Sequence, residues 1–572
     1  MLKYLKKYWL FCLLAPLLML GEITMDLKLP DMMKTIVDDG VQVSNMEVIL
    51  QTGAKMLALL VFGGCCGIGC SICANIAALN FGNDLRKDLF SRIMDLSFQQ
   101  NDHLSTGSLI TRITNDITQV QHMVRMSIRG VVRCTVMFFG GIVMLYRQSS
   151  RFALIVACAL PFLAGFVIFF LKKVTPLYVT IQARIDKINS IMQENIAGAR
   201  VVKAYTKEQA ELEHFSDAND ALYDTNLKAQ TTLAFLNPCV NIIMNICVLC
   251  VLYASGAAAK LGDSITPGET MASITYVTLI LNRVIFMANI FQTFTRASAS
   301  WGRIKEVLHT QPCLVGGNAA PAEERFGEIE FDHVSFSYPD TPDSPVLKDV
   351  SFRVAQGQTL AIIGATGSGK STLSHLIPRF YDVTSGCIRV DGLDVRDYPL
   401  QQLRGKIGTV LQKPELFSRS IRENIAWGKE NATDQEISHA AAIAQAADFI
   451  AATTDGYATQ VTEGGHSLSG GQKQRLSVAR AVLKQPEILI LDDSGSALDL
   501  KTEAALHKAF HEAFRNTTTI IIAQRIASVR NADRILVLDG GVIAASGTHD
   551  ELLQTSELYQ EIYNSQLKKE VS

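Results

Sequence analysis

The chain has 572 residues, too many for one ordinary domain, and its formal net charge at pH 7 is −2. This balance excludes the strongly basic surface typical of nucleic-acid-binding proteins, so we expect no nucleic-acid partner. Hydrophobic residues make up 48% of the chain, close to the average for soluble proteins, so their distribution is more informative than their number. The long apolar runs end before about residue 300, and the remainder has the composition of a soluble α/β protein.

Six stretches of the first part are predicted to cross a membrane. A membrane helix needs about 20 largely apolar residues, and three runs (56–83, 152–171 and 229–259) meet this length without a charged residue. Three more runs contain or adjoin charged residues. We interpret the first stretch as a retained span and not a signal peptide, because no small-residue cleavage site follows it. The expected spans lie near residues 8–36, 54–83, 128–147, 152–174, 229–258 and 268–296.

The long connections after the second and fourth predicted spans carry many basic residues. Lys and Arg are enriched on the cytoplasmic side of membranes, so we expect these connections and the termini there, although Arg147 and Arg151 in a short loop run against the rule. The connections are periodic, which predicts helices that continue out of the bilayer, with reversals near Gly107 and Gly198. We expect a multi-pass protein of a bacterial-type cell membrane (inner or plasma membrane); an organelle membrane is the alternative.

The pattern changes after a linker at residues 309–325, which contains several Pro and Gly residues. Short β-rich segments alternate with helical stretches over residues 326–565, which is typical of an α/β nucleotide-binding fold. The expected fold class is α plus α/β. We expect a six-helix transmembrane domain (1–308) fused to an α/β nucleotide-binding domain, with residues 566–572 as a tail.

A phosphate-binding motif follows a short apolar strand in the second domain. Gly364–Ser371 matches G-x-x-x-x-G-K-[ST] and leads into an expected helix. Lys370 should reach the β- and γ-phosphates, and Ser371 should ligate Mg²⁺. The apolar strand 488–491 ends at Asp492, which we expect to hold the same metal ion. The predicted ATP-binding residues here are Gly364, Ala365, Thr366, Gly367, Ser368, Gly369, Lys370, Ser371 and Thr372.

A second motif opens the helix expected at Lys473–Leu483: it reads Leu468-Ser469-Gly470-Gly471-Gln472. Here the sequence resembles the ATP-binding cassette (ABC) transporters, and more narrowly a half-transporter of the exporter type, over nearly the whole chain. The resemblance implies two cassettes that dimerise head to tail, so that the signature of each closes on the ATP held by the other. Ser469 and Gly471 would then offer hydroxyl and N–H groups to a γ-phosphate in the partner.

Further segments match the pattern of this family. Tyr338 resembles the aromatic residue that stacks on adenine, and Gln412 resembles the glutamine that reaches Mg²⁺. Asp499 resembles a residue of the loop that crosses the cassette interface. The resemblance also implies that Leu109–Asp116 and Gln193–Tyr205 are intracellular segments that dock on cassettes.

Two residues depart from the family pattern in this chain's ATP site. The family usually has Glu after the metal-binding acid, as general base, where this chain has Asp493, and His where this chain has Gln524. The shorter carboxylate would sit about 1.5 Å back, one C–C bond, and a misplacement of about 1 Å can cost roughly a hundredfold in rate. An amide cannot exchange a proton near neutrality. We therefore expect slow or no hydrolysis here, and a different partner subunit that supplies Glu and His to a second, competent site.

Polar residues within the predicted spans indicate a translocation path. Such groups are costly in hydrocarbon unless they face protein or a water-filled cavity, and hydrogen bonding between helices is the alternative explanation. A cavity that contained the two acids of the first span would favour amphipathic or cationic cargo. The candidate residues are Glu22 and Asp26 in the first span, Asn237, Asn241 and Asn245 in the fifth, and Asn282 and Asn289 in the sixth.

The sequence thus predicts ATP-driven export of a small or amphipathic substrate (a drug, lipid or peptide) by one half of a heterodimeric exporter, with ATP and Mg²⁺ as cofactors. Its expected partners are a second half-transporter, membrane lipids and the substrate. Two alternatives stay open: a homodimeric exporter in which Asp493 acts as base, and an ATP-gated channel or regulatory membrane protein.

Overall fold

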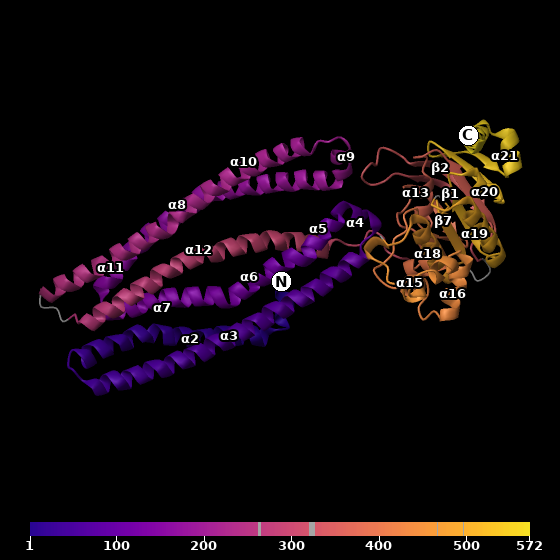
Figure 1. The fold of residues 1–572 in the computed structure, drawn as a ribbon. Coiled ribbons are helices and arrows are strands. Elements are labelled where there is room, and N and C mark those ends of the chain that lie inside the picture. Colours follow the sequence, from indigo (N-terminus) through magenta and orange to yellow (C-terminus); the bar gives the residue numbers. More distant parts are fainter. Residues whose placement is uncertain (261–264, 320–325, 466, 496, 572) are drawn as a thin grey trace. The chain divides into compact units, whose positions relative to one another are not determined.

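The computed structural model describes residues 1–260, 265–319, 326–465, 467–495 and 497–571. The chain forms two compact units (Figure 1). The helical unit comprises Met1–Met94 and Thr106–Thr310, and the cassette unit comprises Asp95–Ser105 and Gln311–Ser572.

The helical unit consists of long helices that run alongside one another (Figure 1). Their bounds are α1 Leu2–Lys6, α2 Trp9–Thr35, η1 Ile36–Val41, α3 Met46–Asp95, α5 Thr106–Thr111, η2 Arg112–Asp116, α6 Ile117–Met126, η3 Ser127–Val131, α7 Val132–Gln148, α8 Ser150–Ala197, α9 Ala199–Ala204, α10 Glu208–Ala234, α11 Leu236–Lys260 and α12 Pro267–His309. α12 packs against α2, α6, α7 and α11, and α8 packs against α10 and α11. The 50 residues of α3 extend about 75 Å, more than twice the thickness of a bilayer's hydrocarbon core.

Apolar side chains of these helices face both inward and outward. Phe152, Tyr276 and Ile280 are fully buried in the core, whereas Phe139 and Phe169 are exposed. Helices satisfy their own backbone polar groups, so such an outward apolar surface suits hydrocarbon. The sixth predicted span lies in α12. Among the described residues, five helical stretches are long and apolar enough to cross a membrane: Trp9–Val41, Met46–Asp95, Thr106–Gln148, Ser150–Ala197 and Glu208–Ala258.

Two sheets form the core of the cassette unit. Their strands are β1 Ile329–Phe336, β2 Leu347–Val354, β3 Thr359–Gly364, β4 Ser385–Val390, β5 Leu393–Asp394, β6 Ile407–Val410, β7 Ile488–Asp492, β8 Thr518–Ile522, β9 Arg534–Asp539 and β10 Val542–Gly547. One sheet is antiparallel, with order β2-β1-β4-β5, and the other has order β10-β9-β3-β8-β7-β6 with parallel pairing from β9 to β6. β7 and β8 are buried along their whole length, as apolar strands of a parallel sheet covered on both faces should be.

Helices surround these sheets and complete two apolar cores. Their bounds are α13 Lys370–Leu376, α14 Leu400–Lys406, α15 Ile421–Ala426, α16 Asp434–Ile443, α17 Ala447–Ala451, η4 Gly456–Ala458, η5 Glu463–Gly465, α18 Gly470–Leu483, α19 Leu500–Ala513, α20 Ile526–Val529, α21 His549–Thr555 and α22 Glu557–Val571. The carboxyl ends of β3, β7 and β8 meet at one edge of the parallel sheet, and this edge positions the site described below.

A short helix from the segment between α3 and α5 also belongs to the cassette unit. This helix, α4 (Phe98–Leu104), packs on the chain just after α13. The ring of Phe98 lies 4.5 Å from the ring of Phe380, and the hydroxyl of Tyr381 donates to Asp102 at 3.3 Å. Aromatic contact and a hydrogen bond thus join this loop of the membrane-spanning part to the cassette.

The structure adds a segment that was not predicted, Asp95–Ser105, to the cassette unit. The predicted Leu109–Asp116 lies in α5 and η2, and Gln193–Tyr205 lies at α8 and α9; that these two segments dock on cassettes stays a prediction. The chain reverses at Ser105, whose φ of +54° is left-handed, and Gly107 lies inside α5. A serine took the turn conformation that the sequence analysis assigned to the nearby glycine.

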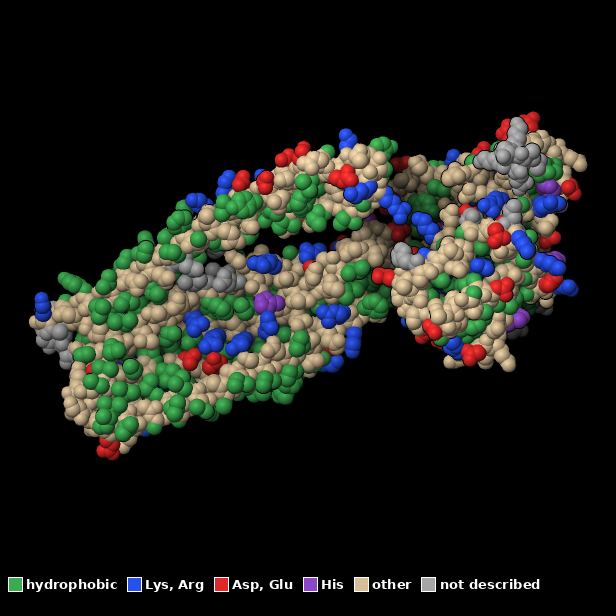
Figure 2. All heavy atoms as spheres, viewed as in Figure 1, with side chains coloured by type: hydrophobic (Ala, Val, Ile, Leu, Met, Phe, Trp, Pro, Cys, Tyr) green, Lys and Arg blue, Asp and Glu red, His purple; other side chains and the backbone are tan. Residues whose placement is uncertain are grey.

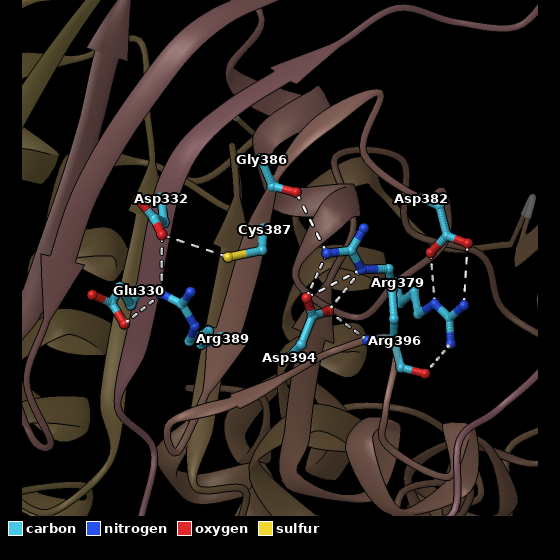
Figure 3. A network of polar contacts seen from close by, with 9 residues as sticks. All are labelled: Glu330, Asp332, Arg379, Asp382, Gly386, Cys387, Arg389, Asp394 and Arg396. Carbon is cyan, nitrogen blue, oxygen red and sulfur yellow. Dashed lines mark hydrogen bonds and ion pairs between the residues drawn. The ribbon is translucent and has the colours of Figure 1, made fainter.

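Charged side chains link the strands of the antiparallel sheet (Figure 3). Arg389 of β4 lies 3.3 Å from Glu330 and 3.2 Å from Asp332 of β1. These side chains are partly exposed, and such pairs contribute at most about 1 kcal/mol each. Two similar pairs close nearby loops: Arg379 with Asp382, and Arg396 with Asp394.

Asp391 forms the buried connection between the two sheets. Its Oδ1 accepts hydrogen bonds from the backbone N–H groups of Gly327 and Glu328, at 2.6 and 3.1 Å. Its Oδ2 accepts from Lys406 Nζ at 2.9 Å, and Lys406 also donates to Glu487 at 2.6 Å. Burial opposes the charge of Lys406, but the two carboxylates raise its pKa above the ordinary lysine value. The start of β1, the end of α14 and the start of β7 are therefore held through one carboxylate.

We expect Asp391→Ala to lower the free energy of unfolding by about 3 kcal/mol, because removing one partner of a buried ion pair leaves the other uncompensated. Thermal or urea unfolding of the full chain in detergent would measure this. Asp349→Ala is the matched control: Asp349 also has a positive φ and contacts a basic side chain, that of His333, but it is exposed, so its loss should stay within about 0.5 kcal/mol. Equal effects of the two substitutions would contradict the role given to Asp391.

Candidate nucleotide-binding site

A cavity of about 330 Å³ lies at the carboxyl edge of the parallel sheet. Four segments of the chain contribute to its lining: the loop between β3 and α13 with the start of α13, the residues after β6, the end of β7 with the residue after it, and the end of β8 with the residues after it. The structure thereby brings together most of the predicted ATP-site residues. Those in the lining are Thr366, Gly367, Gly369, Lys370, Ser371, Thr372, Gln412, Asp492, Asp493 and Gln524.

The loop between β3 and α13 curls tightly at Gly369. Its φ is +98°, and a Cβ there would lie 2.8 Å from Leu347 and 3.0 Å from the carbonyl of Val346, so only glycine fits. Lys370 follows it, 8% exposed, and its Nζ donates to the carbonyl oxygens of Gly364 and Ala365 at 2.9 and 2.7 Å. The ammonium group is thus held inside the loop.

Burial and two nearby carboxylates act on the ammonium group of Lys370 in opposite directions. Burial lowers the pKa of Lys370, and Asp493 and Asp492 act in the opposite direction. The hydroxyl of Ser368 is buried with no hydrogen-bond partner among the described residues. An anion that accepted hydrogen bonds from both side chains would satisfy each of them. The loop therefore fits a phosphate group.

Asp492 ends β7 and is almost completely buried. Its two oxygens accept hydrogen bonds from Ser371 at 3.2 Å and Ser374 at 3.3 Å. Burial raises the pKa of Asp492, which Ser371 and His375 partly offset. Together with the Gln412 side chain, these groups form the oxygen-rich donor set that Mg²⁺ prefers, so the residues fit this ion. The sequence analysis missed Ser374, although it lies one turn after Ser371 on α13.

Asp493 is held by two side-chain amides. Its backbone φ is +49°, a left-handed conformation that is uncommon for residues other than glycine. Its Oδ2 accepts hydrogen bonds from Gln412 Nε2 at 3.3 Å and from Gln524 Nε2 at 3.2 Å. Burial raises the pKa of Asp493, and the Gln412 hydrogen bond opposes the shift. The two residues that depart from the family pattern, Asp493 and Gln524, are thus in direct contact.

Tyr338 lies in an aromatic group beside the loop. Its ring makes edge contacts with Phe336 and Tyr381, at 5.0 and 5.4 Å between centroids. Its hydroxyl lies 3.0 Å from the hydroxyl of Thr372. Tyr381, which the sequence analysis did not single out, therefore connects this group with α4 through Asp102.

The signature residues Leu468–Gln472 are absent from the described lining of this cavity. Ser469 caps α18: its hydroxyl accepts from the Gln472 N–H at 3.3 Å, and the Gln472 side chain accepts from the Ser469 N–H at 2.9 Å. Ser469 and Gly470 are exposed. Asp499 caps α19 through Thr502 at 2.8 Å and is also exposed. Both segments are accessible to another molecule.

The acids of the first span have cationic partners. Arg133 of α7 lies 3.0 Å from Glu22 and 3.3 Å from Asp26, both on α2, and Arg283 of α12 interacts electrostatically with the same group. Two arginines thus balance the two carboxylates, which removes the basis for expecting a cationic cargo. Asn241, Asn245 and Asn282 are exposed, and the side chains of Asn237 and Asn289 lie outside the described residues.

We expect Lys370→Met to weaken binding of a fluorescent ATP analogue by at least about tenfold, because it removes a charge-assisted hydrogen bond to phosphate. Fluorescence titration of the purified full chain would measure the change. Lys348→Met, which removes an exposed lysine of the neighbouring strand β2, should leave the affinity unchanged. An unaltered affinity in Lys370→Met would refute the phosphate contact.

Comparison with known proteins identifies both units. The family model for the ABC transporter transmembrane region matches residues 9–284, and the ABC transporter model matches residues 347–496. An uncharacterized ABC transporter ATP-binding protein of Bacillus subtilis (strain 168), YfiB, is 40% identical over 571 residues, which cover 100% of this chain and 99% of that protein. An ATP-dependent lipid A-core flippase of Syntrophus aciditrophicus (strain SB) is 31% identical over 97% of this chain and 91% of the flippase.

A solved structure shows the same architecture. The structure of a bacterial Atm1-family ABC exporter with ATP bound superposes with a TM-score of 0.81 and 28% sequence identity, covering 96% of this chain and 98% of that one. The membrane-spanning helices and the cytoplasmic cassette make this a multi-pass protein of the cell membrane, and exporters of this architecture work as dimers. The chain belongs to the ABC transporter family, as an exporter subunit that carries one transmembrane region and one ATP-binding cassette.

Proposed function

We propose that this chain exports a small or amphipathic molecule (a drug, lipid or peptide) as one half of a heterodimer, and that its own ATP site hydrolyses ATP slowly or not at all. The observation that carries this is the hydrogen-bonded group of Asp493, Gln524 and Gln412. The named lipid A-core flippase, which is 31% identical, supports an amphipathic cargo.

Asp493 is poorly placed to act as a general base. Its carboxylate is about 1.5 Å shorter in reach than that of Glu, and a catalytic group misplaced by about 1 Å can lose roughly a hundredfold in rate. Two side-chain amides already donate hydrogen bonds to Oδ2. These hydrogen bonds stabilise the carboxylate form of Asp493, but the amides cannot accept a proton from it. Gln524 has no proton to exchange near neutral pH. The site therefore favours holding ATP over cleaving it.

The remaining parts of the site support binding. Lys370 and Ser368 fit phosphate oxygens, and Ser371, Asp492 and Gln412 would hold Mg²⁺, which when bound neutralises charge on the phosphates. The exposed signature at Ser469 is intact. These features suit a subunit that binds one ATP itself and presents its signature to the ATP of a different subunit, which supplies the Glu and His of a competent site.

α4 would transmit the state of the cassette to the membrane helices. It packs against Phe380. Phe380 follows α13, the helix that the phosphate-binding loop leads into. In sequence, α4 lies between the last residue of α3 and the first residue of α5. A movement of α13 on ATP binding would therefore reach α3 and α5 through the Phe98–Phe380 contact and the Tyr381–Asp102 hydrogen bond.

Restoring the usual residues should raise turnover. We expect the double substitution Asp493→Glu with Gln524→His to increase the ATPase rate of the purified chain by at least about tenfold, because it restores both the reach of the base and an exchangeable proton. Phosphate release at saturating ATP measures this rate. The same substitutions combined with Lys370→Met provide the control. Robust turnover by the unaltered chain that is lost in Asp493→Ala would instead show a working homodimer.

Removing the aromatic contact should uncouple α4 from the cassette. We expect Phe98→Ala to retain ATP affinity but to reduce by several-fold the ATP-dependent change in hydrogen exchange at the end of α3, since a ring pair contributes about 0.5–1.5 kcal/mol. His103→Ala, an exposed position on the same helix, is the control. A full exchange response in Phe98→Ala would show that coupling runs elsewhere.

A further inference from the structure

A second cavity, of about 560 Å³, lies within the helical unit between α3, α6 and α12. Its lining is polar and includes Gln119, Gln121, His122, Arg125, Gln292 and Arg296. The described lining contains two arginines and no Asp or Glu. The volume lies in the range of small-molecule binding sites, about 300–1,000 Å³.

One contact orients two of the donors of this cavity, Arg125 and His122. Arg125 Nη2 lies 2.7 Å from His122 Nδ1. A guanidinium has only donors, so Nδ1 must accept, and the proton of the neutral imidazole is then on Nε2. Arg125, His122 and Arg296 therefore all present N–H groups, and no acidic side chain of the described residues lies within ion-pair distance of either arginine.

The acids of the same unit are already balanced. Glu22 and Asp26 are paired with Arg133, so they do not offset the charges of Arg125 and Arg296. Figure 2 shows blue side chains gathered around a purple one on the helical unit, with red side chains nearby. The lining of the cavity does not include Glu22, Asp26 or Arg133.

Depth within the helices places the cavity near the cytoplasmic boundary of the bilayer. Gln292 lies about 38 Å along α12 from its first residue, Pro267, and Asn75 lies about 44 Å along α3 from Met46, at 1.5 Å per residue. The hydrocarbon core is about 30 Å thick. Basic residues are common at this boundary in membrane proteins. That general tendency does not explain why two arginines, a histidine and three glutamines line the same cavity.

We propose that this cavity binds the anionic group, a carboxylate or phosphate, of the exported molecule as it enters from the cytoplasmic side. The cargo class is then an anionic amphipath, supplied either by the headgroup of an anionic lipid or by a soluble organic anion. This inference rests on the proposed export function and replaces the cationic cargo that the acids of α2 suggested. All lining residues come from this chain, so the cavity can be tested on the purified full chain.

The test uses three probes that share one fluorophore: dansyl glutamate (anionic), dansyl cadaverine (cationic) and dansyl amide (neutral). Binding to the full chain in phosphatidylcholine nanodiscs is measured by dansyl fluorescence. We expect dansyl glutamate to bind at least about tenfold more tightly than dansyl cadaverine, since each charge-assisted hydrogen bond contributes at least a factor of about ten. Equal binding of the three probes, or a preference for the cation, would overturn the proposal.

Substitutions test whether the preference for dansyl glutamate arises from this cavity. Arg125→Gln with Arg296→Gln should abolish it, and Lys87→Gln, which removes an exposed cation of α3 outside the lining, should preserve it. Arg125→Lys with Arg296→Lys keeps the charge and should retain most of the preference, which guards against misfolding of the neutral variant. Persistence of the preference in the glutamine variant, or its loss in the lysine variant, would overturn the assignment.

Two further measurements distinguish a lipid headgroup from a soluble anion, and anion binding from ATP-driven export. If added phosphatidylglycerol displaces dansyl glutamate, the occupant is a lipid headgroup, and if it does not, the occupant is a soluble anion; either result supports the cavity. Charge-selective binding without ATP-dependent uptake of dansyl glutamate into inside-out vesicles, prepared with the partner subunit, would support the cavity while defeating the export function. ATP-dependent uptake of all three probes alike would support export while overturning the anion site.

Discussion

A charge removed from water needs a partner, and this constraint organises both units. In the cassette, Asp391 is fully desolvated and holds Lys406 together with the backbone at the start of β1. In the helical unit, Asp116 is almost completely buried and accepts a hydrogen bond from Arg303 at 2.8 Å. Arg133 likewise forms ion pairs with both Glu22 and Asp26. Because an unpaired buried charge costs several kcal/mol, each of these contacts fixes the packing of helices or strands that are distant in sequence.

Two of the less completely paired groups lie where we place ligands. Lys370 is buried against carbonyl oxygens, and the hydroxyl of Ser368 has no partner among the described residues. Arg125 and Arg296 face a cavity whose described lining holds no carboxylate. Both sites present side-chain donors to which an incoming phosphate or carboxylate could hydrogen-bond.

Features that a local segment determines could be predicted from the sequence. The loop at Gly369 needs a left-handed glycine between a strand and a helix, and the motif contains both the residue and its context. The pairing of Arg133 with Glu22 could not be predicted, since it joins α7 to α2 and depends on how the helices pack. The start of α4 had a local signal, the Ser97–Gln100 capping box. It was missed because the search for a chain reversal favoured glycine over Ser105.

The contact between Asp493 and Gln524 links the two residues that depart from the family pattern. The amide of Gln524 donates to the carboxylate, and Gln412 donates to the same oxygen, so the residues that follow β6, β7 and β8 stay connected without a catalytic water. Burial favours the protonated form of Asp493, and the donated hydrogen bonds favour the carboxylate. An isolated change of Glu to Asp would leave a shorter acid facing a protonatable histidine. With Gln524 in place of the histidine, the structure has instead a hydrogen bond from the amide to the shorter acid, and the proposal of slow hydrolysis rests on this pair.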